Sequence, residues 1–413
     1  MSGADAAAAP GAVSHPPVHC HHFSAGRCGS CTLMGTPYRV QLQRKDAAVR
    51  GLLAAQVPAM AWEAPLASAP EGFRTKAKFV VGGSAAAPTL GILDTADRGV
   101  DLRDCGLHVP ELAAVTDRLA RFVTRAALPP YDLARRRGEL KHLVLTAAPS
   151  GDLMLRLVLR TEGPLPRIRE HLPGLLADLP QLRVVSANLH PEHKATLSGE
   201  VEIALTEQTL LPLELPGVTL FAGPGAFVQT NTTVAAALYQ QATAWLVDAG
   251  ARRVADLYCG VGGFALHAAA AGTEAVGVEI AADAVRGARA GAASLTQGPG
   301  GGSARFVVAD ASDPAAVLAA AGTDRDAMVV NPPRRGLGPD LPAMLDARSP
   351  AADPASALRT LVYSSCNPAT LATDLAGLPH LQVRSARLFD MFPNTDHAEV
   401  VVLLEPRTGT LGG

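Results

Sequence analysis

The 413-residue sequence has no strong excess of charge of either sign: 36 Lys and Arg residues face 38 Asp and Glu residues, and the formal net charge is −2. Without a global basic field, such a chain can contact nucleic acid only through local clusters. No run of eighteen apolar residues occurs, so we expect no membrane-spanning helix. The first nineteen residues, rich in Ala, Pro and Gly, lack the basic start and apolar core of an export signal. We therefore expect a disordered leader over 1–18 and a cytoplasmic protein.

Cysteine is scarce, with six residues, and four of these lie in roughly the first quarter of the chain: Cys20, Cys28, Cys31 and Cys105. In a large chain without an export signal, clustered cysteines indicate metal binding or thiol chemistry rather than disulfides. The Cys-x-x-Cys spacing favours metal, but it suits a tetrahedral zinc ion and an iron–sulfur cluster equally. Nearby imidazoles add possible ligands: His19, His21 and His22.

Apolar residues make up 48% of the chain, enough to fill the cores of two or three domains. From Phe73 to about Leu220, short apolar runs separated by turn residues predict an antiparallel sheet with a few helices. From about Thr230, strands alternate with Ala-rich helices, and the last two strands follow each other directly. This order predicts a doubly wound, mostly parallel α/β sheet with an antiparallel edge.

These patterns divide the chain into an N-terminal α+β domain over 19–222, a catalytic domain over 223–407 and a short tail over 408–413. The expected strands of the catalytic domain are 254–258, 275–279, 306–308, 327–330, 361–363, 383–389 and 400–404. Its expected helices are 234–247, 264–271, 281–295, 315–321 and 369–375.

A glycine-rich loop with Gly260, Gly262 and Gly263 follows the first of these strands and opens a helix, the context in which such loops bind nucleotides. Glu279 ends the next strand, where an acidic side chain can bind ribose hydroxyls. The spacing fits a dinucleotide as well as S-adenosylmethionine, and a plain glycine turn with a surface Glu is the alternative. Asp310, ending the third strand, is placed either to face an adenine or to cap a helix.

Cys366 lies between an apolar strand and a helix, at the edge where open α/β sheets bind ligands. Because a helix N-terminus lowers the pKa of a thiol, we expect a nucleophile, although buried cysteines are usually inert packing residues. Cys259, inside the glycine loop, is expected to be such a packing residue.

Two further polar segments border the same edge. Asn331 precedes two prolines, which form a stiff turn and hold its side chain toward the cleft. The alternative is a turn without a functional role. Glu399 lies in the segment that joins the last two strands and is a candidate base, with His397 positioning it or the substrate. A polar hairpin loop is the alternative.

Basic residues form two clusters that could bind RNA phosphates or remain solvated faces. One cluster alternates along a strand and so shares one face: Arg74, Lys76 and Lys78. The other comprises Arg135, Arg136, Arg137, Lys141 and His142. Arg334 and Arg335, after the proline pair, could also contact phosphate.

Taken together, these residues resemble the uracil-C5 RNA methyltransferases from Cys20 to about Leu404. The resemblance is strongest to the branch that acts on 23S rRNA. Its features are Asn-Pro-Pro-Arg-Arg-Gly at 331–336, Gly-Phe-Arg-Thr-Lys-Ala-Lys at 72–78, Gly-Glu-Leu-Lys at 138–141, and no RNA-binding barrel before Cys20. The leader and the His-rich surroundings of Cys20 depart from the pattern.

The resemblance implies a class I S-adenosylmethionine methyltransferase fold with an N-terminal iron–sulfur domain, methylating C5 of a uridine in 23S rRNA. The implied ligands of a [4Fe-4S] cluster are Cys20, Cys28, Cys31 and Cys105. The implied cofactor contacts are Gln229, Tyr258, Glu279 and Asn331. Cys366 would be the nucleophile, adding to C6 of the uracil, and Glu399 the base.

No obligate protein partner is expected. The alternatives are the same chemistry on a tRNA uridine, or a non-catalytic iron–sulfur RNA-binding protein that keeps the fold. Enzymes that methylate cytosine in RNA commonly carry a second Cys in the proline-containing loop, and the absence of one at 331–333 favours uracil.

Overall fold

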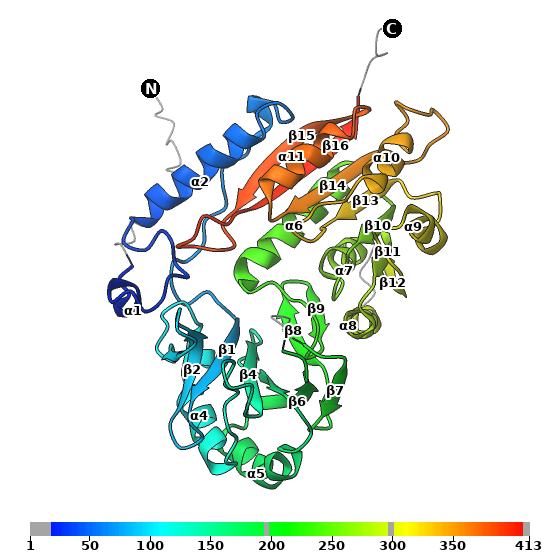
Figure 1. Ribbon diagram of the computed structural model, residues 1–413. Helices are drawn as coiled ribbons and strands as arrows, with labels where there is room; N and C mark the ends of the chain where they lie inside the picture. Colours follow the sequence, from blue (N-terminus) through cyan, green and yellow to red (C-terminus); the bar gives the residue numbers. More distant parts are fainter. Residues whose placement is uncertain (1–17, 194–197, 296–300, 408–413) are drawn as a thin grey trace, which may run out of the picture.

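The computed structural model describes residues 18–193, 198–295 and 301–407. The expected tail, and the expected leader apart from its last residue, lie outside these ranges. Figure 1 shows two large sheets, an N-terminal one below and a C-terminal one above, with the β8–β9 hairpin between them.

The C-terminal sheet has seven strands in the order β12-β11-β10-β13-β14-β16-β15. Its members are β10 (Arg253–Leu257), β11 (Glu274–Glu279), β12 (Ser303–Val308), β13 (Ala327–Val330), β14 (Thr360–Ser365), β15 (Leu381–Phe389) and β16 (Glu399–Pro406). The strands from β12 to β14 pair in parallel, whereas β16 pairs antiparallel with both β14 and β15. The predicted doubly wound sheet with an antiparallel edge is therefore confirmed.

Helices cover both faces of this sheet, because successive side chains of a strand point to opposite faces. On β13, Val329 lies in the core that contains α6, α7 and α8, whereas Met328 and Val330 lie in the core that contains α2, α9, α10 and α11. These helices are α2 (Tyr38–Leu52), α6 (Thr232–Asp248), α7 (Gly263–Ala270), α8 (Ala282–Ser294), α9 (Pro314–Ala321), α10 (Asp340–Ala347) and α11 (Pro368–Ala376). None of the helices in the described parts of the chain is both long and apolar enough to cross a bilayer.

Helix α10 was not predicted. Pro339 and Pro342 signal a turn in the sequence, but Pro342 lies in the first turn of the helix. There the missing N–H costs nothing, because the first four amide groups of a helix have no partner within it. The helix supplies the crossover that the parallel pairing of β13 and β14 requires.

The N-terminal sheet also has seven strands, in the order β3-β2-β1-β4-β5-β6-β7. Its members are β1 (Lys76–Gly83), β2 (Pro88–Leu93), β3 (Gly99–Asp101), β4 (Leu140–Ala147), β5 (Leu153–Leu159), β6 (Leu182–Leu189) and β7 (Val201–Ala204), with α3 (Pro110–Ala113), α4 (Thr116–Arg125) and α5 (Leu165–Asp178). The predicted antiparallel sheet is confirmed at every pair except one, since β5 and β6 are parallel. Helix α5 is the crossover that makes this pairing possible.

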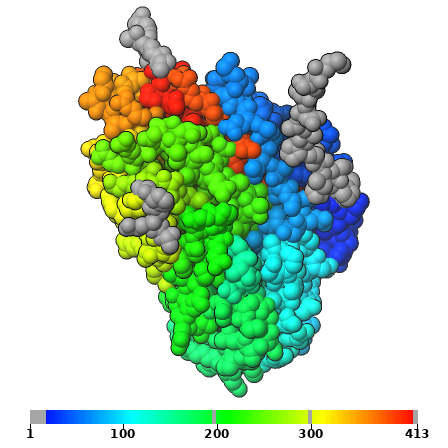
Figure 2. All heavy atoms as spheres, turned by 180° about the vertical axis from the view of Figure 1, so that it is seen from behind, coloured from blue at the N-terminus to red at the C-terminus, as the bar shows by residue number. Residues whose placement is uncertain are grey.

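Helix α2 and the segment that follows it precede β1 in sequence but pack on the C-terminal sheet. Val49 and Leu53 of α2 share a core with β14 and β16. After the short helix η1 (Ala59–Ala61), backbone bridges join Trp62 to Ala386 and Leu66 to Phe389 on β15. In Figure 2 the blue surface of this segment meets the orange-red surface of the C-terminal strands. The remaining elements are α1 (His21–Ser24) and the hairpin of β8 (Leu211–Leu215) and β9 (Val218–Ala222).

Candidate active site

The glycine loop after β10 has a backbone path that few residue types can adopt. Gly260 has φ +55° and Gly262 φ +86°, and a Cβ built on Gly262 would lie 2.7 Å from the Phe306 ring. Tyr258 also has a positive φ, 58°, which is uncommon for a residue with a side chain. Strained backbone of this kind clusters at ligand sites. Because Gly262 packs so closely on Phe306, the loop lies close to β11 and β12, and it leads directly into α7.

Glu279, at the end of β11, is held against this loop. Its carboxylate accepts hydrogen bonds from the amide of Gly260, at 3.1 Å, and from the amide of Ala281, at 2.8 Å. The same contacts fix the loop and orient the carboxylate at the carboxyl edge of the sheet, which is where the predicted ribose contact requires it.

Asp256 is a residue whose importance the sequence reasoning missed. Its side chain is fully buried, and one oxygen accepts a hydrogen bond from the amide of Ala265 at 2.9 Å. Burial, partly opposed by that hydrogen bond, raises the pKa of Asp256 to about 8, and Glu279 adds to the rise. The carboxyl group thus links the end of β10 to the start of α7 beneath the loop. The signal available in the sequence was the position of Asp256, a charged residue, on an otherwise apolar strand.

A pocket in front of the loop gathers three of the four predicted cofactor contacts: Gln229, Tyr258 and Asn331. Asn331 reaches it because β13 lies beside β10, and its backbone amide donates to the carbonyl of Leu257 at 3.3 Å. Phe227, which was not predicted, also lines this pocket and is 67% exposed. An exposed aromatic ring beside such a pocket can stack on a flat ligand such as a nucleobase.

Cys366 and Glu399 come from neighbouring antiparallel strands. The register of β14 and β16 pairs Ser365 with Val400, so the next step places Cys366 opposite Glu399 on one face of the sheet. The carbonyl of Arg334 accepts a hydrogen bond from the Asn367 side chain at 3.0 Å, which ties the proline loop to this corner. The structure thus brings both predicted catalytic residues and the loop that carries Asn331 to one edge.

Glu399 is 2% exposed and accepts a hydrogen bond from the Ser364 hydroxyl at 2.5 Å. Burial raises the pKa of Glu399 to about 7, against the opposing effect of that hydrogen bond. A carboxylate in this range can accept a proton near neutral pH. Ser364 was not predicted as a partner; its only signal was a polar residue at the end of an apolar strand. His397, the expected partner, is exposed, and its ring lies edge-on to Phe392, with 6.1 Å between ring centres.

The expectation that the helix N-terminus lowers the pKa of Cys366 was wrong. Burial and the negative charge of Glu399 raise the pKa of this thiol, and the Arg334 guanidinium only partly opposes them. Cys366 precedes the N-cap of α11, Asn367, whose own side chain accepts the hydrogen bond from the amide of Ala369. The thiol is nevertheless half-exposed and so within reach of a ligand.

The four N-terminal cysteines line a single cavity of about 360 Å³, although Cys105 is far from the others in sequence. Burial, then the proximity of Cys105, Cys28 and Cys20, raises the pKa of Cys31 to about 11. Arg74 also lines this cavity and opposes the rise. Thiolates so close together, with Cys31 buried and the other three half-buried, need positive charge beside them, which is what a metal centre supplies.

The imidazoles next to Cys20 have another partner. His22 contacts the Asp104 carboxylate at 2.7 Å and His21 contacts it at 3.3 Å. This contact joins the segment of Cys20 to the segment of Cys105. All three side chains line the thiol cavity.

The first basic cluster is not one exposed stripe. Lys76 donates to the carbonyl of Ala226 at 2.9 Å, and burial, with Arg156, lowers its pKa to about 8. Lys78 is exposed and Arg74 is half-buried, and both line the thiol cavity. In the second cluster Arg135, Arg136 and Arg137 are exposed, whereas Lys141 is buried, donates to the carbonyl of Glu192 at 2.6 Å and lies over the Tyr131 ring.

Two other sequence expectations concern single residues. Cys259 is 6% exposed and lies in the core with α6 and α7, which confirms a packing role. Asp310 is exposed and accepts hydrogen bonds from the amide and hydroxyl of Ser312 at 2.8 and 2.7 Å. It does not cap α9, because Asp313 does so.

A doubly wound sheet with an antiparallel edge is typical of class I methyltransferases, and the glycine loop and the acidic residue that ends the next strand fit this class. Comparison with known proteins agrees. A family model described as tRNA (Uracil-5-)-methyltransferase matches residues 322–407. The crystal structure of Pyrococcus abyssi tRNA (uracil-54, C5)-methyltransferase in complex with S-adenosyl-L-homocysteine has a similar fold, with a TM-score of 0.73 at 23% identity over 91% of this chain and 85% of that one.

Sequence similarity identifies the family within this class of methyltransferases. The 23S rRNA (uracil(747)-C(5))-methyltransferase RlmC of Cronobacter sakazakii is 44% identical over 388 residues, which are 94% of this chain and 99% of the relative. The protein of the same name from Vibrio vulnificus is 43% identical over the same shares of both chains. The chain belongs to the RNA uracil-C5-methyltransferase family and is an enzyme of that type.

Proposed function

We propose that this protein methylates C5 of a uridine in 23S rRNA, using S-adenosylmethionine and a covalent bond between Cys366 and C6 of the uracil. The observation that carries the proposal is the pairing of a half-exposed thiol with a buried carboxylate across β14 and β16, beside the glycine-loop pocket. The choice of 23S rRNA rests on the names of the relatives that are 43–44% identical to this chain.

The first step needs the thiol. Uracil C5 is a weak nucleophile, but addition of the Cys366 sulfur to C6 moves the ring electrons onto C5 and O4, so that C5 becomes enolate-like. S-adenosylmethionine would supply the electrophilic methyl group that C5 attacks, and S-adenosylhomocysteine would leave as the methyl–sulfur bond breaks. Because the pKa of Cys366 is raised, the half-exposed thiol must give its proton to solvent water before or as it adds, and Arg334 is the cation that favours the thiolate.

The second step needs the carboxylate. After methyl transfer, C5 still carries its hydrogen, and Glu399 removes that proton as the bond between C6 and the Cys366 sulfur breaks. The electron pair of the C5–H bond forms the C5–C6 double bond, and the thiolate leaves. A pKa of about 7 suits this proton transfer at neutral pH. The Ser364 hydroxyl holds the carboxylate in place.

The substrate base must leave its stack, since both its C6 and C5 positions have to meet side chains at the sheet edge. Phe227 offers an exposed ring beside the pocket on which an extruded base or a neighbour can stack. The exposed Arg135, Arg136 and Arg137 are suited to phosphate contacts on the N-terminal domain.

The thiol cavity supports a cluster better than a single zinc ion. Four sulfurs around one zinc lie about 3.8 Å apart, because each Zn–S bond is about 2.3 Å in a tetrahedron. Among the described residues, the trio whose ligand atoms all lie within 4.8 Å of one another is His21, His22 and Asp104, not a set of thiols. The wider spacing and the 360 Å³ cavity fit a [4Fe-4S] cluster held by Cys20, Cys28, Cys31 and Cys105.

The test is incubation of the protein with unmodified 23S rRNA and labelled cofactor, followed by mass mapping of methylated nucleotides. We expect one 5-methyluridine. Methylation of tRNA instead would replace the substrate, and RNA binding without methylation would favour the non-catalytic alternative. RNA containing 5-fluorouridine should trap an adduct at Cys366, because fluorine cannot leave as a proton does. Methylation without a linkage at this residue would refute the mechanism.

A further inference from the structure

The segment that joins β15 to β16, hereafter the β15–β16 loop (residues 390–398), borders two sites at once. The loop ends where β16 begins with Glu399, the proposed base. Along its length, Phe392, Pro393 and Thr395 line the cavity that holds the four N-terminal cysteines. One short loop therefore borders both the thiol cavity and the strand position of the base.

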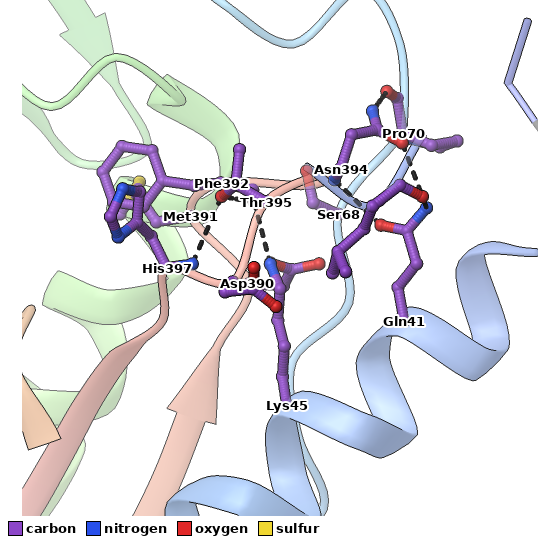
Figure 3. Close-up of polar contacts among 12 residues, drawn as sticks. Gln41, Lys45, Ser68, Pro70, Asp390, Met391, Phe392, Asn394, Thr395 and His397 are labelled. Carbon is purple, nitrogen blue, oxygen red and sulfur yellow. Dashed lines mark hydrogen bonds and ion pairs between the residues drawn. The ribbon is translucent and has the colours of Figure 1, made fainter. Parts of the chain in front are cut away.

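Helix α2 holds the start of this loop through a buried ion pair (Figure 3). The Lys45 ammonium lies 2.7 Å from Asp390, and the two side chains are 3% and 0% exposed. Lys45 also donates to the carbonyl of Phe392 at 2.8 Å. Because the Lys45 side chain is almost entirely shielded from solvent, its ammonium depends on these partners, and the contacts fix both ends of the first turn of the loop.

Gln41, one turn earlier on α2, holds the middle of the loop. Its amide donates to the Asn394 side chain at 3.1 Å, and its carbonyl accepts from the Asn394 amide at 2.9 Å. Asn394 is fully buried and has φ 64°, a backbone conformation that few residues adopt without support. Figure 3 shows Asn394 between Gln41 and Pro70, whose carbonyl accepts from its side chain at 2.8 Å.

The cysteine-bearing segment holds the loop from the other side. The amide of Leu33, two residues after Cys31, donates to the carbonyl of Asn394 at 3.0 Å. The hydroxyl of Thr32 donates to Asp396 at 2.9 Å. Gln41 joins the two segments, since its side-chain amide also donates to the carbonyl of Thr36 at 2.8 Å.

We propose that Gln41 and Lys45 are positioning residues for the methyl-transfer reaction. They hold the β15–β16 loop between α2 and the cysteine-bearing segment, and so fix where Glu399 stands relative to Cys366. The two catalytic groups depend on these contacts differently. Cys366 follows β14, which lies inside the sheet between β13 and β16, whereas Glu399 follows the loop directly. Loss of the contacts should therefore disturb the proton-removing step more than the addition step.

This inference rests on the proposed function, and its test separates the two. Lys45→Met and Gln41→Leu keep the size of each side chain and remove its polar head. With unmodified 23S rRNA and S-adenosylmethionine, both variants should lose at least tenfold in kcat. A denaturant-resistant RNA–protein adduct should accumulate to at least fivefold the wild-type level, because the thiol still adds but the base no longer removes the C5 proton. The KM for RNA and the affinity for S-adenosylhomocysteine should change less than threefold.

Gln43→Leu is the matched control, since Gln43 lies on the same helix but is exposed. It should behave as wild type. Asn394→Gly provides a variant that keeps the left-handed backbone and removes only the side-chain contacts. Combined with Gln41→Leu it should lose less than the sum of the two single losses, because both changes remove the hydrogen bond between the Gln41 side-chain amide and the Asn394 side-chain oxygen.

If turnover and adduct yield fall in parallel in the variants, and S-adenosylhomocysteine binding weakens as well, then Gln41 and Lys45 have a merely structural role. That result would overturn the inference. Unchanged turnover in both variants would overturn it too. A wild-type protein that neither methylates RNA nor forms an adduct would instead refute the proposed function, before any variant is compared.

Discussion

Glu399→Gln is the substitution for which the structure gives the sharpest expectation, because activity and stability should change in opposite directions. Removing a positioned general base costs roughly 10²- to 10⁴-fold in rate, or about 3–5 kcal/mol of transition-state stabilisation. We expect kcat to fall within this range. Glutamine keeps the shape of the side chain and an oxygen that can accept the hydrogen bond from Ser364. Cofactor binding should therefore persist, and an RNA adduct should accumulate.

Stability should respond with the opposite sign. Burial raises the pKa of Glu399 from the ordinary 4.5 to about 7, so holding this group ionised costs the folded state about 3 kcal/mol. Below pH 4.5 the group is protonated in both states and costs nothing. As the pH rises from 4.5 to 7 the unfolded chain loses its proton first, so this favourable contribution to folding is lost. Above pH 7 the cost is complete.

Glutamine carries no charge at any pH. The variant should therefore exceed wild type in free energy of unfolding by up to about 3 kcal/mol at pH 8 and by nothing near pH 4. Denaturant titrations at several pH values measure this difference, and a steady-state pH profile should show wild-type kcat rising up to about pH 7. Glu405→Gln on the same strand is the control, because its ion pair with Arg384 is partly exposed and contributes little. Wild-type turnover by Glu399→Gln would remove this residue from the base role. A difference in free energy of unfolding between Glu399→Gln and wild type that does not change with pH would refute the raised pKa of Glu399.

The other expectations concern the thiols and the cofactor loop. Cys366→Ala should abolish methyl transfer and adduct formation while leaving S-adenosylhomocysteine affinity within about threefold on titration; residual turnover above about 1% would contradict a nucleophilic role. Glu279→Ala removes the proposed acceptor of the ribose hydroxyls and the carboxylate that holds the amides of Gly260 and Ala281, and should weaken S-adenosylhomocysteine binding at least about tenfold, since a hydrogen bond to a charged group is worth about 1.5–3 kcal/mol. Unchanged affinity would exclude Glu279 from the cofactor site. Cys31→Ser should remove most iron from anaerobically purified protein by elemental analysis, and full iron content or stoichiometric zinc in the wild type would reverse the cluster proposal.

Periodicity in the sequence was sufficient to predict the C-terminal sheet, because buried parallel strands and Ala-rich helices leave clear signals. The glycine loop and the apolar runs around it predicted β10, α7 and β11 to within one residue at each end. Helix α10 was not predicted because prolines at 339 and 342 signal a turn. Only the crossover that the parallel strands β13 and β14 require reveals it. Helix α2 has no strong apolar stripe, and its packing against β14 and β16 depends on a partner far along the chain.

Residue types and spacing thus determined which side chains were candidates for chemistry: the thiols, the acidic strand ends and the asparagine before the prolines. Only the tertiary structure decided which of them meet, since the register of β14 and β16 places Glu399 opposite Cys366 from 33 positions away in the numbering. It also decided their proton affinities, because burial and neighbouring charge raise the pKa of Cys366 where local sequence predicted a fall. The physical reason is that spacing along a chain is local, whereas desolvation and electrostatic interaction depend on which distant segments pack together.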